Sequence, residues 1–179
     1  QAAAEILKRV KTLTPQDLLL VLVSGGGSSL LSLPADGITM SDLKQVTSQL
    51  LRSGALIQAM NIVRKHLSAI QGGRLAAASR APVLALVISD VTGDDPTHIA
   101  SGPCAPDPST YQDALDILKR FAIQPPLAVA THLARGARGE IPETPKPGDR
   151  VFVKTENRVI ATARQSLQAA ADYFTSHGI

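Results

Sequence analysis

Two runs of apolar residues in this chain are continuous rather than alternating, Leu18 to Val23 and Val83 to Ile88. A short continuous run is typical of a strand that is covered on both faces, as in a parallel sheet. Two shorter stretches, Val151 to Val153 and Arg158 to Ala161, are also predicted to be strands.

Helical spacing of apolar residues fills the segments between these strands. Helices are predicted at residues 2–11, after an N-cap at Thr39 or Ser41, at 55–67, at 74–80, after a capping box at 109–112, at 127–137, and over a last segment that turns Leu167, Ala170, Ala171 and Phe174 inward. Strands that alternate with helices predict an α/β fold with a mainly parallel sheet.

The helix predicted at 55–67 has polar residues opposite its apolar face. Asn61 and Lys65 lie on that side, with Arg64 between them and the apolar face. Asn is a poor helix former, so its place inside a helix needs a reason. A solvated face and part of a binding site are both open interpretations.

Composition narrows the class of protein. The chain has 179 residues, of which 44% are hydrophobic and 18% charged, as in one globular domain. Aromatic residues make up 3%, and the net charge of +3 is scattered, which argues against nucleic-acid binding. Cys104 is a single cysteine, which excludes a disulfide framework. Without a membrane-spanning apolar run or a signal-peptide pattern, we expect a cytoplasmic protein.

A glycine-rich loop, Ser24 to Ser29, follows the first predicted strand. It is not a P-loop, because no Gly-Lys-Ser/Thr follows. It is not the dinucleotide fingerprint either, because Leu30 stands where the third glycine belongs. Glycines still allow a backbone nest for an anion, and Ser28 and Ser29 add hydroxyl donors. A plain tight turn is the alternative.

An aspartate-rich loop follows the second predicted strand and carries Asp90, Asp94 and Asp95. Carboxylates at a strand end suit Mg²⁺, which shares oxygen ligands with substrate phosphates. Turn and cap roles are the alternative. His98 lies nearby as a candidate general base, and the turn after Ala100 offers a further backbone donor.

Three segments, LVSGGGSSLLSLPADGIT, LLRSGALIQAMNIVRKHLSAIQGGRLA and ISDVTGDDPTHIASGPCAPDPST, resemble the N-terminal domain of class II glycerate kinases. These enzymes are glycerate 2-kinases, for which hydroxypyruvate reductase is an older label. The resemblance, from about Asp17 onward, implies a Rossmann-like three-layer α/β/α fold. It also implies ATP-dependent phosphorylation of D-glycerate to 2-phosphoglycerate with Mg²⁺, in a cleft between this domain and a smaller C-terminal one.

The resemblance also implies roles for individual residues. The positions that match the family's pattern are Ser24, Gly25, Gly26, Gly27, Ser28, Ser29, Asn61, Arg64, Lys65, Gly72, Gly73, Arg74, Asp90, Gly93, Asp94, Asp95, Ser101 and Gly102. We expect Arg64, Lys65 and Asp90 to be catalytic, and Asp90 and Asp94 to hold the metal. The glycine loop, Asn61, Gly72, Gly73, Ser101 and Gly102 are expected to bind substrate or phosphate.

Two residues depart from the family pattern: Gln71 replaces a common Lys, and Cys104 a common Thr. The family's Gly-Lys-Ala segment would precede Gln1, and its C-terminal domain would follow Ile179. We therefore expect residues 1–179 to be an incomplete N-terminal domain that is inactive alone. An NAD(P)H-dependent hydroxypyruvate reductase and a non-catalytic sugar-acid or nucleotide-binding module are the alternatives, and a homodimer is left open.

Overall fold

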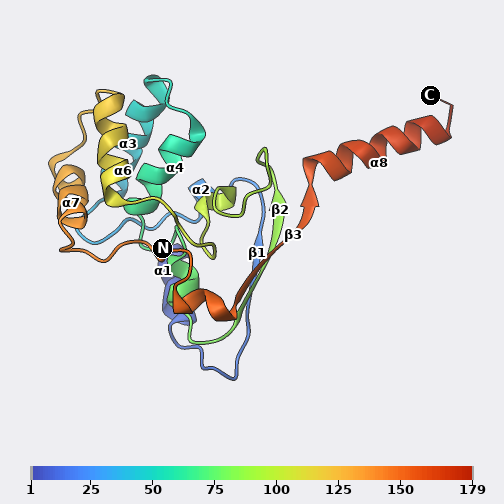
Figure 1. Ribbon diagram of the computed structural model, residues 1–179, viewed down its shortest axis with the longest axis horizontal. Helices are drawn as coiled ribbons and strands as arrows, with labels where there is room; N and C mark the ends of the chain where they lie inside the picture. The colour runs from blue at the N-terminus through green and yellow to red at the C-terminus, as the bar shows by residue number, and fades with distance from the viewer. Residues whose placement is uncertain (1, 179) are drawn as a thin grey trace.

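The computed structural model describes residues 2–178, so Gln1 and Ile179, the ends of the expected domain, lie outside the described residues. Figure 1 shows the arrangement of its elements. In chain order these are α1 (Ala2–Val10), β1 (Leu19–Val23), α2 (Gly27–Leu30), α3 (Met40–Arg52), α4 (Ile57–His66), α5 (Arg74–Ala77), β2 (Val83–Ser89), the 3₁₀ turn η1 (Ile99–Ser101), α6 (Tyr111–Arg120), α7 (Leu127–Ala137), the 3₁₀ turn η2 (Arg150–Lys154), β3 (Thr155–Thr162) and α8 (Ala163–Ser176).

The three strands form one parallel sheet with β2 in the centre. Val23 at the end of β1 pairs with Val87 near the end of β2. Both strands therefore end at the same edge of the sheet. The α/β fold with a parallel sheet, predicted from the alternating pattern, is confirmed.

Helices cover one face of this sheet. Val83, Ala85 and Val87 are buried there in a cluster that includes Val10 of α1 and Leu75 of α5. The side chains of the other face are more open in the described chain: Leu20, Leu22 and Ile88 are 51%, 74% and 47% exposed. Continuous apolar runs predicted strands covered on both faces, and this is wrong for residues 2–178. A continuous apolar run indicates that both faces of a strand could be buried, but it does not determine whether another element lies against each face.

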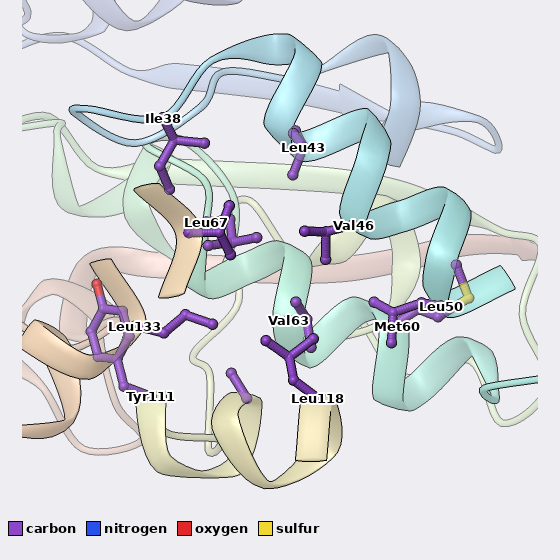
Figure 2. Close-up of a cluster of buried hydrophobic side chains, with 12 residues drawn as sticks. Ile38, Leu43, Val46, Leu50, Met60, Val63, Leu67, Tyr111, Leu118 and Leu133 are labelled. Atoms are coloured by element: carbon purple, nitrogen blue, oxygen red, sulfur yellow. The ribbon is translucent and has the colours of Figure 1, made fainter. Parts of the chain in front are cut away.

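A helical layer of α3, α4, α6 and α7 packs around its own core (Figure 2). Thr39 is the N-cap of α3, and its side chain and that of Asp42 form a capping box. The apolar spacing predicted Leu43, Val46 and Leu50 as the inner face of this helix, and all three are buried. This layer holds α4, which carries the polar residues discussed below.

The start of α6 differs by one residue from the prediction. Its capping box pairs Thr110 with Asp113, whereas the sequence pattern predicted Ser109 with Gln112. The Ser109 hydroxyl donates instead to the carboxylate of Asp107. The contact with Asp107 thus occupies the hydroxyl of Ser109, and the hydroxyl of Thr110 caps the helix instead.

The end of the chain contains two wrong predictions. Val151 to Val153 belongs to the 3₁₀ turn η2 and not to a strand, whereas β3 is one strand of eight residues. The inward face predicted for α8 is exposed, with Leu167 at 71% and Phe174 at 50%. Figure 1 shows α8 extending from the end of β3, away from the helical layer. An amphipathic pattern buries a face only where another element lies against it.

Among the described residues, no helix is both long and apolar enough to cross a membrane.

Candidate functional site

The glycine loop and the aspartate loop meet at the edge of the sheet where β1 and β2 end. The contact is close, because a Cβ atom added to Gly25 would lie 2.7 Å from Oδ2 of Asp90. Real Cβ atoms do not approach another atom so closely, so a side chain at position 25 would displace the Asp90 carboxylate. The structure thus brings together the two loops that the sequence predicted to form one site.

The glycine loop presents backbone donors. Gly26 has φ of 80°, a left-handed conformation that favours glycine. Within residues 2–178, the N–H groups of Gly25, Gly26, Gly27 and Ser28 have no intramolecular acceptor. Gly25 and Gly26 are exposed. Unbonded N–H groups at an exposed loop can bind an anion.

The carbonyl group of Ser28 anchors the other side of this loop. It accepts hydrogen bonds from Nη2 of Arg64 and, at 2.9 Å, from Nε2 of Gln71. The Gln71 amide also donates to the carbonyl of Leu31 at 3.1 Å, and Gln71 is only 3% exposed. Sequence reasoning noted Gln71 only as a departure from the family pattern. The sequence offered a weak signal for a structural role, the position of this amide directly before the pair Gly72-Gly73.

A chain of polar side chains connects the loop to α4. The hydroxyl groups of Ser28 and Ser101 lie 2.9 Å apart, and Oγ of Ser101 donates to Oδ1 of Asn61 at 3.3 Å. Asn61 is 3% exposed and Ser101 is fully buried. The interpretation of a solvated face is therefore wrong for Asn61. The helix tolerates this residue because its amide holds the segment behind the glycine loop.

Four of the predicted ligand-binding residues form a backbone bridge behind the loop. The N–H of Gly72 donates to the Ser101 carbonyl at 3.0 Å, and that of Gly73 to the Gly102 carbonyl at 2.7 Å. The N–H groups of Ser101 and Gly102 donate to carbonyls of their own turn. All four residues are buried. Direct ligand contact by these residues stays a prediction, but their N–H groups already have acceptors.

Lys65 lies in an enclosed network below this bridge. Its Nζ atom is 3.2 Å from Oδ1 of Asp107, and the two side chains are 2% and 0% exposed. The Ser109 hydroxyl donates to the same oxygen at 2.6 Å. Burial raises the pKa of Asp107, but the Lys65 charge and the Ser109 hydrogen bonds lower it further, so the pKa lies below its ordinary value. Sequence analysis missed Asp107, because an acid in a proline-rich segment resembles an ordinary turn residue.

Arg64 differs from its neighbour. The residue is half-buried, and no carboxylate within residues 2–178 forms an ion pair with it. Burial lowers the pKa of its guanidinium group. Only the hydrogen bond to Ser28 occupies its five N–H donors in the described chain. Arg64 is thus a cation held in one position, and its other N–H groups have no acceptor in the described chain.

The aspartate loop divides into two parts. Asp90 is exposed, and neither it nor Asp94 has a side-chain hydrogen bond in the described chain. Asp94 has φ of 54°, a rare conformation for a residue other than glycine. Asp95 accepts from the N–H of Thr97 at 2.8 Å, which confirms a turn role for this acid. Its carboxylate also lies 4.0 Å from Nε2 of His98.

The described residues contain no group of three His, Cys, Asp or Glu side chains that could hold a metal ion. The carboxylates of Asp90 and Asp94 have no hydrogen-bond partner in the described residues, and carboxylate oxygens are ligands that Mg²⁺ combines with water and phosphate.

Comparison with known proteins gives the family. The model of the DUF4147 domain, described as a domain of unknown function, matches residues 1–134. The chain belongs to this family. It is 42% identical over 171 residues to the glycerate 2-kinase of Pyrococcus horikoshii, covering 94% of this chain and 38% of that protein. A relative from Agrobacterium vitis carries a provisional hydroxypyruvate reductase name and is 48% identical over 172 residues, covering 96% of this chain and 37% of that protein.

A solved structure shares the fold as well. The crystal structure of a glycerate kinase from Thermotoga maritima matches with a TM-score of 0.84 at 38% identity, covering 99% of this chain and 41% of that one. The resemblance to glycerate kinases that the three motifs predicted is confirmed. The chain spans about two fifths of the length of these relatives.

Proposed function

We propose that this DUF4147 domain supplies one wall of the active site of an ATP-dependent glycerate 2-kinase. The reaction converts D-glycerate to 2-phosphoglycerate. The observation that carries the proposal is the meeting of an open glycine loop with the free carboxylate of Asp90 at one edge of the sheet. Relatives and a solved structure that are named as glycerate kinases support the choice of reaction.

The glycine loop is assigned the phosphate groups of the nucleotide. Phosphoryl transfer depends mainly on positioning and on neutralising charge. The N–H groups from Gly25 to Ser28 are suited to this task because no acceptor in the described chain competes for them. The Ser28 carbonyl, held by Arg64 and Gln71, keeps those donors in place.

Asp90 and Asp94 are assigned the magnesium ion. When bound, Mg²⁺ would neutralise negative charge on the phosphate oxygens. The close contact between the Asp90 carboxylate and Gly25 supports a metal site beside the loop to which the phosphate groups are assigned. A side chain at position 25 would take up this space.

The acceptor must lose the proton of its O2 hydroxyl as that oxygen bonds to phosphorus and ADP leaves. His98 stays a candidate for the group that accepts this proton. Its Nδ1 atom is buried without a partner in the described chain, and Nε2 faces Asp95. Lys65, predicted as catalytic, is better suited to a supporting role, since its ammonium is enclosed and paired with Asp107.

A coupled assay on the protein at its full natural length tests the proposal. ATP consumption with D-glycerate is measured in parallel with NADH oxidation by hydroxypyruvate. We expect the first activity and not the second, because the loop lacks the dinucleotide fingerprint. NADH oxidation without ATP consumption would establish the reductase alternative. The absence of both activities would leave a non-catalytic binding module.

A further inference from the structure

A cavity of about 270 Å³ lies beside the glycine loop, between α2, α3 and α4. Lys44, Thr47 and Ser48 line it from one face of α3, at the spacing that places helix residues side by side. Arg64 lines it from α4. None of the described residues that line it is acidic.

The charges around this cavity are unbalanced. Arg64 is half-buried without a carboxylate partner in residues 2–178, and a buried charge is costly unless it is paired. Its hydrogen bond to the Ser28 carbonyl holds the guanidinium group in position. Lys44 has no ion pair in the described part of the chain either. Two cations thus border one cavity that no described acidic residue lines.

The hydroxyl groups of the cavity are not equivalent. Those of Thr47 and Ser32 donate to backbone carbonyls, at 2.8 Å to Leu43 and 2.9 Å to Ser29. The Ser48 hydroxyl has no partner within the described residues. Ser48 therefore offers a neutral hydroxyl donor in the same cavity as the two cations. The rest of the lining, which includes Met40, is mostly apolar and suits a short carbon skeleton.

We propose that this cavity binds the oxyanion of a small ligand through Arg64, Lys44 and Ser48. A carboxylate or a phosphate group has the charge and the acceptor oxygens that these donors require. The carboxylate of the acceptor acid is one source and free phosphate the other. The identity of the acid rests on the proposed function, whereas the anion site itself does not.

Arginine footprinting and calorimetry test the site on the protein at its full natural length. Phenylglyoxal modifies accessible arginines, and peptide mass spectrometry measures the extent at Arg64. The probes are D-glycerate, inorganic phosphate, and glycerol, which has no charged group. Dissociation constants are then measured without ATP for the wild type, Lys44→Met, and the matched control Lys119→Met, an exposed lysine on α6.

We expect D-glycerate to protect Arg64, glycerol to leave it reactive, and Lys44→Met to weaken binding about tenfold, since a hydrogen bond to a charged group is lost. Lys119→Met should bind like the wild type. Protection by phosphate alone, weakened by Lys44→Met in the same way, supports the site with free phosphate as its source. The inference is overturned if neither anion protects Arg64, or if the two lysine variants bind alike. If the protein phosphorylates D-glycerate but gives either of those results, the anion site is refuted and the proposed kinase activity is not. If an anion protects Arg64 but the protein has no kinase activity, only the proposed kinase activity is refuted.

Discussion

Arg64 and Lys65 are neighbours in α4, yet their charges have opposite surroundings. Arg64 lies at the wall of an open cavity, donates to the Ser28 carbonyl, and has no acid partner in the described chain. Lys65 is enclosed, 2% exposed, and paired with Asp107. A rotation of about 100° per residue along a helix separates a cation available to ligands from one committed to the fold. The residue type therefore does not reveal which of two adjacent cations is left without an acid partner in the described chain.

The same contrast holds between the two groups of glycines. Gly25 to Gly27 have N–H groups without intramolecular acceptors in the described chain, whereas those of Gly72 and Gly73 donate to the turn at residues 101–102. One group is at the surface where a ligand could reach it, and the other joins two segments behind it. We call the first kind of residue the open wall, which includes the glycine loop, Arg64 and Asp90, and the second kind the enclosed support, which includes Lys65, Asp107 and the Gly72-Gly73 pair. The four predictions below test this division.

The largest expected effect on stability comes from Lys65→Met. It leaves the Asp107 carboxylate buried without its cation, so we expect the free energy of unfolding to fall by about 3 to 5 kcal/mol. Denaturant titration at full natural length measures it, and Lys44→Met, at an exposed lysine, is the control. The double variant Lys65→Met/Asp107→Asn should recover much of the loss. A loss below about 1 kcal/mol would place Lys65 outside the enclosed support.

Asp90→Asn tests the open wall. We expect turnover to fall at least about a hundredfold, equivalent to about 3 kcal/mol in the barrier, because the metal loses a charged ligand. Stability should change by less than about 0.5 kcal/mol, since Asp90 is exposed and has no side-chain hydrogen bond in the described chain. Steady-state kinetics measure the effect, with Asp36→Asn as an exposed control. Near-normal turnover would contradict the metal role.

Gln71→Leu tests the connection between support and wall. The Ser28 and Leu31 carbonyls lose a buried donor, so we expect a loss of about 1 to 3 kcal/mol in stability. The Michaelis constant for ATP should also rise, because the glycine loop loses an anchor. Gln71→Lys restores a donor and should cost less. Equal losses for the two variants, or an effect as small as that of the exposed control Gln45→Leu, would show that the anchor is unimportant.

The smallest effect concerns pH. Burial lowers the pKa of His66, outweighing its hydrogen bond to the Ile62 carbonyl and the charges of Asp107 and Glu143. The unfolded chain binds a proton near the ordinary pKa of 6.5, before the folded protein does. The contribution of His66 to the free energy of unfolding is therefore fully present above about pH 6.5 and falls as the pH drops below it. Denaturant titrations between pH 7.5 and 5 measure this, and a flat profile would show that His66 is not held neutral.

Some of this molecule could be predicted from short-range patterns. Capping and apolar spacing located α3, and the two strand ends with glycines and aspartates indicated a shared site. Other predictions were wrong where a short apolar run can form more than one structure, as in Val151 to Val153, or where no element of the described residues covers the apolar face, as at α8. Asp107 and the role of Gln71 escaped prediction because their partners lie about 40 residues away along the chain.

The sequence by itself determined the α/β class, the two loops at the strand ends and the resemblance to glycerate kinases. These depend on hydrophobic periodicity, local turn chemistry and long motifs, which are all properties of contiguous residues. Only the tertiary structure decided which polar groups face the cavity and which pair with one another. Burial and ion pairing depend on contacts between distant segments, and no local pattern encodes whether Arg64 or Lys65 meets an aspartate.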